Sequence, residues 1–85
     1  MVQAILPNST PFYRRKLIEQ IFGYSRSTIY RRINMGLFPR PIHIGQNSSA
    51  WPSHEIDAIS KALIAGQSDD QIKALVESLH ADRKA

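Results

Sequence analysis

The chain has 85 residues, of which 42% are hydrophobic, 11 are Lys or Arg, 7 are Asp or Glu, and none is Cys. This length allows one small domain, residues 1–85, and the lack of cysteine excludes a disulfide framework and a thiolate metal site. No stretch approaches the ~18 consecutive apolar residues of a membrane span, so no membrane partner is expected, and residues 1–11 lack the pattern of a signal peptide. These features favour a reducing, cytoplasmic location.

The formal net charge of +4 is unevenly distributed along the chain. Residues 1–51 carry seven Lys or Arg and one acid, whereas residues 52–85 carry four Lys or Arg and six acids. A basic part beside a mildly acidic part indicates one face for a polyanion and another for packing or a partner, with chance unevenness in a small protein as the alternative.

A first helix is predicted over about residues 11–22. Thr10 followed by Pro11 is typical of a helix start, because threonine caps free N–H groups and proline suits the first helical position. Residues 1–9 before it are predicted to be a partly ordered leader. Apolar residues recur downstream at helical spacing and form the expected buried face: Leu17, Ile18, Ile21 and Phe22.

The segment 23–33 predicts the turn and second helix of a helix-turn-helix. Gly23 is typical of a helix end, and Ser25 stands where the next helix needs a hydroxyl cap. Ile29 and Ile33 are four residues apart, so both are expected on one buried stripe. The helix is predicted over about residues 26–35, ending at Gly36.

The outward face of the 26–35 helix is predicted to contact DNA. At about 100° per residue, Arg31 and Asn34 point nearly opposite the buried isoleucines. An arginine fork matches guanine or phosphate, and an asparagine amide matches adenine. Tyr30 has packing on the preceding helix as its alternative role. The predicted contacts from this helix are Arg26, Ser27, Thr28, Tyr30, Arg31, Arg32 and Asn34.

A small hairpin is predicted directly after this helix. Pro39 and Pro41 impose an extended path. Residues 42–44 and 49–51 then have strand character on either side of the turn chemistry of residues 45–48. Trp51 and Phe38 are expected in the core. Predicted DNA contacts from this region are Arg40, His43, Gln46 and Asn47, and an ordinary solvent-exposed strand position is the alternative for His43.

Two further helices complete the prediction. One begins at Pro52-Ser53 and ends at Gly66, with an apolar stripe of Ile56, Ile59, Leu63 and Ile64. Ser68 and Gln71 resemble a capping box for a helix over residues 68–80, whose stripe is Ile72, Leu75, Val76 and Leu79. The acids of both helices are expected as caps or solvent-facing residues, and residues 81–85 as a frayed tail.

The stripe of the 68–80 helix requires burial, since four large apolar residues would otherwise form an exposed patch. The helix folds back on the helices of residues 11–22 and 53–65, or it pairs with its twin in a weak or DNA-assisted homodimer. The seam is only about two turns long, shorter than the ~3–4 heptads of an independent coiled coil, which favours packing within the chain.

Catalysis and cofactors are not expected. The sequence contains no glycine-rich phosphate loop and no recognisable nucleophile motif, so no enzyme activity is predicted. His43, His54 and His80 are far apart and lack neighbouring ligands at metal spacing. We therefore predict neither a metal site nor a cofactor.

Three separated motifs occur in order: Ser25-Arg26-Ser27-Thr28-Ile29-Tyr30-Arg31, then Gly36-Leu37-Phe38-Pro39-Arg40-Pro41, then Trp51 followed by Glu55-Ile56-Asp57. Over about residues 12–65 the chain thereby resembles the AlpA family of small phage-derived DNA-binding regulators. The resemblance implies a winged helix-turn-helix of the MerR and excisionase type, mainly α with a small β-hairpin, spanning about residues 11–66. The neutral turn of the hairpin and the extra C-terminal helix depart from the family pattern.

The resemblance implies sequence-specific binding to double-stranded DNA in the bacterial nucleoid. The protein would act as a transcription regulator, or as an excisionase that directs a phage integrase, with integrase or RNA polymerase as protein partners. The residues themselves favour the same DNA binding. They leave one alternative from another class, a protein–protein adaptor that uses the apolar stripe of the 68–80 helix.

Overall fold

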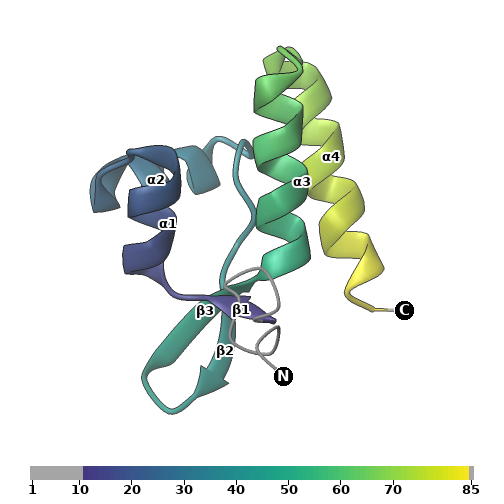
Figure 1. Ribbon diagram of the computed structural model, residues 1–85. Coiled ribbons are helices and arrows are strands. Elements are labelled where there is room, and N and C mark those ends of the chain that lie inside the picture. Colours follow the sequence, from purple (N-terminus) through teal and green to yellow (C-terminus); the bar gives the residue numbers. More distant parts are fainter. Residues whose placement is uncertain (1–10, 85) are drawn as a thin grey trace, which may run out of the picture.

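A computed structural model describes residues 11–84. The fold is mainly helical, and these described residues form four helices and a small antiparallel sheet of strand order β1-β3-β2. Figure 1 shows α1 and α2 on one side, α3 and α4 on the other, and the β2–β3 hairpin projecting away from both pairs. The elements are β1 (Phe12–Tyr13), α1 (Arg15–Phe22), α2 (Arg26–Asn34), β2 (Ile42–Gly45), β3 (Ser48–Pro52), α3 (Ser53–Ile64) and α4 (Asp69–Asp82).

The start of α1 differs from the prediction. The helix begins at Arg15, and residues 12–13 form an edge strand in which Tyr13 pairs with Trp51. The Pro11 carbonyl accepts the N–H of Ser53 at 2.8 Å, so this segment also ties the start of α3 to the sheet. Pairing with β3 therefore overrides the local helix-start signal. Thr10 and the predicted leader lie outside the described residues.

The buried face of α1 is also narrower than expected. Ile18 is fully buried and Phe22 is half-buried, whereas Leu17 and Ile21 are exposed. The helix is only eight residues long and packs on α2 and β3. Those two neighbours cover one side of it.

The turn and α2 confirm the sequence prediction closely. Gly23 ends α1 in the left-handed conformation, with φ of 70°. The Ser25 hydroxyl oxygen accepts the N–H of Thr28 at 3.2 Å and caps α2. Ile29 is 0% exposed, and Ile33 is partly buried against the same core. The buried stripe of α2 is thus oriented as the spacing indicates.

A row of aromatic rings joins the helical pair α1–α2 to the hairpin. Phe22 stacks on Tyr24 and meets Phe38 edge-on, and Phe38 in turn meets Trp51 edge-on, with ring centroids 5.3 to 6.1 Å apart. The Trp51 indole N–H donates to the Pro39 carbonyl at 2.7 Å, so its only polar group is satisfied while buried. Both predicted core aromatics, Phe38 and Trp51, are confirmed.

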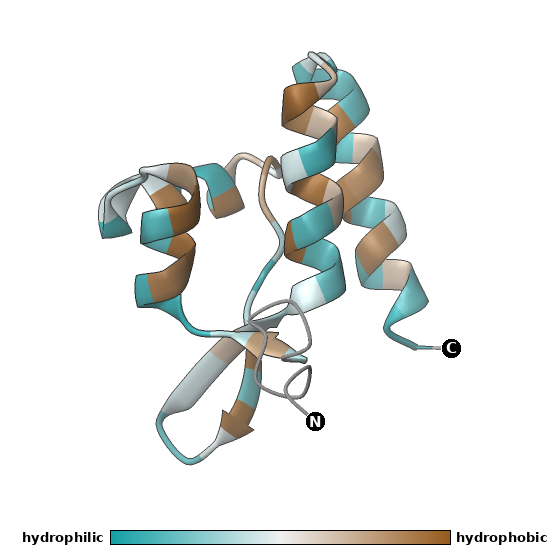
Figure 2. Cartoon of the chain, in the orientation of Figure 1, coloured by the Kyte–Doolittle hydropathy of each residue, from teal (hydrophilic) through white to brown (hydrophobic). Residues whose placement is uncertain are grey.

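Helices α3 and α4 pack against each other, and Figure 2 shows hydrophobic residues recurring along both. Ile72, Val76 and Leu79 of α4 are buried, which confirms that the stripe packs within the chain. On α3, Ile64 was predicted to be buried but is 86% exposed. It stands five residues after buried Ile59, which puts it about 140° around the helix from that position. No helix within residues 11–84 is long and apolar enough to cross a membrane.

Glu55 stands in the first turn of α3, as expected, but it is buried, whereas the acids of this helix were expected as caps or solvent-facing residues. It is 0% exposed and accepts two hydrogen bonds from Arg83, at 2.8 Å from Nε and 2.6 Å from Nη2. Arg83 lies just past the end of α4, in the segment predicted to be frayed. A paired bidentate arginine is what allows a carboxylate to be buried at the base of α3.

The buried position of Ile29 predicts that Ile29→Ala destabilises the fold by about 2–5 kcal/mol, through lost burial and a residual cavity. Chemical or thermal unfolding measures this loss. Ile64→Ala is the matched control: it removes the same atoms from an exposed site, so its midpoint should stay within experimental error of the wild type. Equal effects of the two substitutions would contradict the described orientation of these helices.

The Glu55–Arg83 pair predicts that Arg83→Gln lowers the free energy of unfolding by about 3 kcal/mol, because it leaves a buried carboxylate without its cation. This is the lower end of the usual range, since the Arg83 side chain keeps 20% of its surface exposed. The double variant Glu55→Gln/Arg83→Gln should recover part of the loss in urea unfolding. A double variant less stable than Arg83→Gln would argue against an unpaired charge as the cause.

Candidate nucleic-acid interface

The exposed face of α2 carries five of the seven contact residues that were predicted for this helix. Ser27, Arg31 and Asn34 are exposed, as are Arg26 and Tyr30. Within residues 11–84, Arg31 and Asn34 form no side-chain hydrogen bond or ion pair. A guanidinium and an amide thus stand uncommitted on the face opposite Ile29. These are the groups that form paired hydrogen bonds with base edges.

Three of the predicted α2 residues contact other side chains of the protein. Thr28 is half-buried, and its hydroxyl lies 2.9 Å from that of Ser25. The Arg32 guanidinium lies over the Tyr24 ring at 5.3 Å from the centroid, and that of Arg26 lies 5.9 Å from the centroid of Tyr30. Both arginines can use their stems for packing while the charge stays near the surface.

The predicted contact residues of the hairpin lie in two different settings. His43 and Gln46 are exposed, and a register irregularity falls between His43 and Gly45. Asn47 adopts φ of 58°, a left-handed conformation that asparagine tolerates better than most residues. That turn directs the chain back into β3 and puts Asn47 at the edge of a hollow beside α1 and α2.

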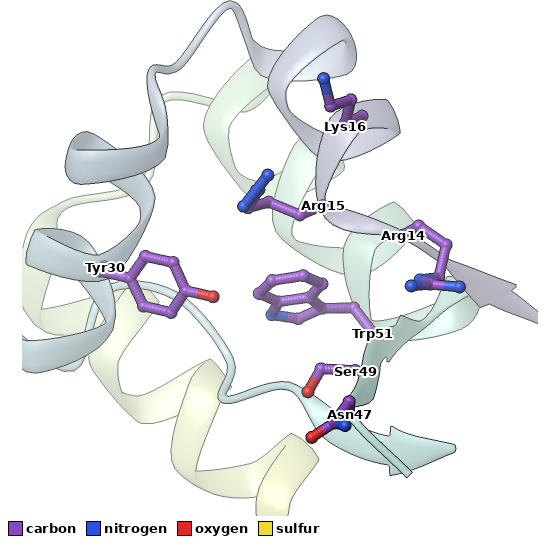
Figure 3. Close-up of a pocket in the computed structure, with 7 residues that line it drawn as sticks. All are labelled: Arg14, Arg15, Lys16, Tyr30, Asn47, Ser49 and Trp51. Atoms are coloured by element: carbon purple, nitrogen blue, oxygen red, sulfur yellow. The ribbon is translucent and has the colours of Figure 1, made fainter. Parts of the chain in front are cut away.

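This hollow, of about 320 Å³, lies between α1, α2 and the hairpin. Figure 3 shows the Arg15 guanidinium and the Tyr30 hydroxyl reaching toward the Trp51 indole from different elements. Asn47 and Ser49 close the hairpin side, and none of the described residues that line the hollow is acidic. Its lining residues are Arg14, Arg15, Lys16, Tyr30, Asn47, Ser49 and Trp51.

Two of the predicted contact residues, Tyr30 and Asn47, therefore meet in one place. Sequence reasoning missed the three cations beside them, residues 14–16, and also Ser49. The available signal was the run Arg-Arg-Lys itself, which accounts for three of the seven basic residues in the first 51 positions. These three residues face α2 because residues 12–13 form a strand and α1 therefore starts later than predicted.

Arg40, also a predicted DNA contact, does not join this group. Its backbone N–H donates to His80 Nε2 at 3.1 Å, and its carbonyl accepts a hydrogen bond from Arg83 at 2.7 Å. The Arg40 guanidinium lies 3.3 Å from His80 Nδ1. The structure thus places Arg40 beside the C-terminal end of α4.

The neighbours of His80 favour its neutral form. Because Nε2 accepts the fixed backbone N–H of Arg40, the ring proton belongs on Nδ1, and the contact of Nδ1 with the guanidinium is not a hydrogen bond. Burial lowers the pKa of His80, Arg40 and Arg83 lower it further, and Glu55 acts in the opposite direction.

Among residues 11–84, no three His, Asp or Glu side chains gather at a site that could hold a metal ion.

Comparison with known proteins identifies the family of the chain. Residues 12–59 match the family model described as "Prophage CP4-57 regulatory protein (AlpA)". An "Uncharacterized protein ORF88" of Enterobacteria phage P4 is 38% identical over 64 residues, which cover 73% of each chain. No solved structure matches the chain.

The environment of His80 predicts a pH-dependent stability. Folding lowers its pKa below the usual value of about 6.5, so the unfolded chain takes up the proton first as the pH falls. The contribution is fully present above pH ~6.5 and decreases below it until the folded form is protonated as well. Thermal melting at a series of pH values measures this dependence.

The matched pair for this measurement is His80→Gln and His54→Gln, since His54 is exposed. His80→Gln should reduce the change in melting temperature between about pH 7 and pH 5. His54→Gln should leave the wild-type dependence of melting temperature on pH unchanged. A slope that survives His80→Gln would assign the pH dependence to another group.

Proposed function

The chain belongs to the AlpA family of prophage regulatory proteins, and from this we propose that it regulates by binding specific double-stranded DNA as a winged helix-turn-helix. The observation that carries the proposal is the exposed α2 face, on which Arg31 and Asn34 have no side-chain partner among residues 11–84, while Ile29 fixes the opposite face in the core. A helix suits insertion into a major groove when one side is buried and the other presents an arginine donor fork and an asparagine donor–acceptor pair.

In this proposal α2 enters the major groove and the β2–β3 hairpin follows the neighbouring backbone or minor groove. Arg31 and Asn34 contact base edges, while Arg26 and Arg32 supply positive charge beside them. Ser27 and Thr28 stand near the start of α2, where hydroxyl and backbone N–H groups suit a phosphate. On the hairpin, the residues proposed to contact the DNA backbone are His43, Gln46 and Asn47. Arg40 is also a proposed contact, at the edge of the interface nearest the C-terminal end of α4.

Two biological roles use this same docking: transcription regulation, with RNA polymerase as the partner, and excision, with a phage integrase as the partner. Both place the protein on DNA in the bacterial cytoplasm. The adaptor alternative loses its motivation, because the α4 stripe is covered by the chain itself. For the same reason, a weak or DNA-assisted homodimer on a repeated site would have to pair through another surface.

Arg31→Ala tests the assignment of α2. It should weaken binding to a selected duplex by about 1–3 kcal/mol and relax base preference, since a bidentate arginine contact carries about that discrimination. Affinities are measured at one salt concentration on a duplex selected by the wild-type protein from a random library and on its scrambled version. Lys61→Ala, an exposed cation on α3, is the control for charge.

A uniform loss on both duplexes would assign Arg31 to phosphate instead of bases. If Arg31→Ala bound both duplexes as the wild type does, α2 would not be the reading helix, and the proposed docking would be wrong.

A further inference from the structure

The hollow between α1, α2 and the hairpin concentrates positive charge. Three consecutive cations, Arg14, Arg15 and Lys16, contribute to its lining from the start of α1. Glu19, one turn later, is the nearest acid along the helix, and its carboxylate lies 3.1 Å from Arg15 Nε. The buried Nε forms no hydrogen bond with a described residue, and Arg15 is one of the side chains that line the hollow (Figure 3). One acid leaves this cluster clearly cationic.

The polar groups opposite the cations are uncommitted. Within residues 11–84, neither the Tyr30 hydroxyl nor the Asn47 amide forms a hydrogen bond. The Trp51 indole N–H is already bonded to Pro39, so the ring serves as an apolar floor. A group seated here would meet arginine nitrogens, a phenol O–H and an amide from three different elements.

These properties select an anion. At about 320 Å³ the hollow is at the small end of the ~300–1,000 Å³ usual for ligand pockets, and those are mostly apolar. A cationic lining with additional neutral donors matches a phosphate group, whose oxygens accept several hydrogen bonds at once. The shared chemistry fits both a free phosphate ion and a phosphodiester.

We propose that this hollow seats one backbone phosphate of the bound DNA, on the strand that separates the groove entered by α2 from the groove followed by the hairpin. The inference rests on the proposed function, since a helix in one groove and a hairpin at the next must straddle a sugar–phosphate strand. The hollow lies between these two elements. Arg15 and Tyr30 hold the phosphate, and Asn47 closes over it from the hairpin.

The test compares the salt dependence of DNA binding among four proteins: wild type, Arg15→Gln, Tyr30→Phe and Glu19→Gln. Arg15→Gln should weaken binding about fivefold to tenfold. It should also make the slope of log affinity against log salt less negative by about 0.9, the value for one phosphate contact. Tyr30→Phe removes a donor without changing charge, so affinity falls a few-fold at an unchanged slope. Glu19→Gln breaks the same ion pair as Arg15→Gln but keeps the cation, so it should retain wild-type affinity or exceed it.

A second arm uses duplexes in which single phosphates are replaced by neutral methylphosphonates. At one position the replacement should weaken the wild type but not weaken Arg15→Gln any further. If every replacement affects both proteins equally, or if Arg15→Gln keeps the wild-type slope, the hollow holds no DNA phosphate. Thermal melting of each variant verifies that it is folded.

The third arm titrates inorganic phosphate into the free protein, followed by NMR at the Arg15, Tyr30 and Asn47 signals. Micromolar saturation would assign the hollow to a free anion and overturn the proposal, whereas weak, millimolar binding is expected of a seat built for a tethered phosphate. A wild-type protein that binds no duplex would refute the proposed function itself. Wild-type binding that is insensitive to Arg15→Gln would refute only the phosphate seat.

Discussion

The burial of Trp51 is the constraint on which the rest of the arrangement depends. Its strand is the central one of the sheet, paired with β1 on one side and β2 on the other. Its ring packs edge-on against Phe38, and its N–H is bonded to the Pro39 carbonyl. One side chain therefore sets how far the hairpin stands from the helical pair α1–α2. The same ring forms the floor of the basic hollow, so core packing also determines the width of that site.

Stability and surface chemistry are assigned to different parts of this fold. Helix α4 covers the apolar face of α3 and supplies, just past its end, the cation for Glu55. The acidic C-terminal part of the chain thus completes the core. The basic residues of α1 and α2 therefore stay on the surface and do not need acidic partners in the core. Like charges on one face repel each other. A core completed elsewhere allows the fold to tolerate that repulsion.

Local chemistry determined the elements that could be predicted from sequence. Gly23, Ser25 and the isoleucine pair specify the turn and α2 through capping and helical period alone, and Ser68 with Gln71 does the same for α4. Two of the errors arose where a partner distant in sequence decides the outcome. Residues 12–13 become a strand because β3 is available, and Glu55 is buried because Arg83 reaches it.

One part of the candidate site could be predicted from local sequence, and the other part depends on contacts between distant segments. The exposed set on α2 follows from its period, whereas the hollow combines residues 14–16 with Tyr30 and Asn47. No periodicity brings those three segments together. Their meeting depends on the late start of α1, which follows from the pairing of residues 12–13 with β3, and on the left-handed turn at Asn47.

The ion pair between Glu55 and Arg83 also has a consequence for the order of folding. The two residues are 28 positions apart, and during synthesis the carboxylate is made first. Until Arg83 is in place, burial of the N-terminal end of α3 would leave the Glu55 carboxylate without a cation in an apolar environment. Water must therefore remain around this carboxylate. Closing so long a loop is a slow, non-local step compared with forming the helices themselves. The nascent chain can therefore form α2 and its capped turn early, while α3 reaches its final packing only as α4 docks.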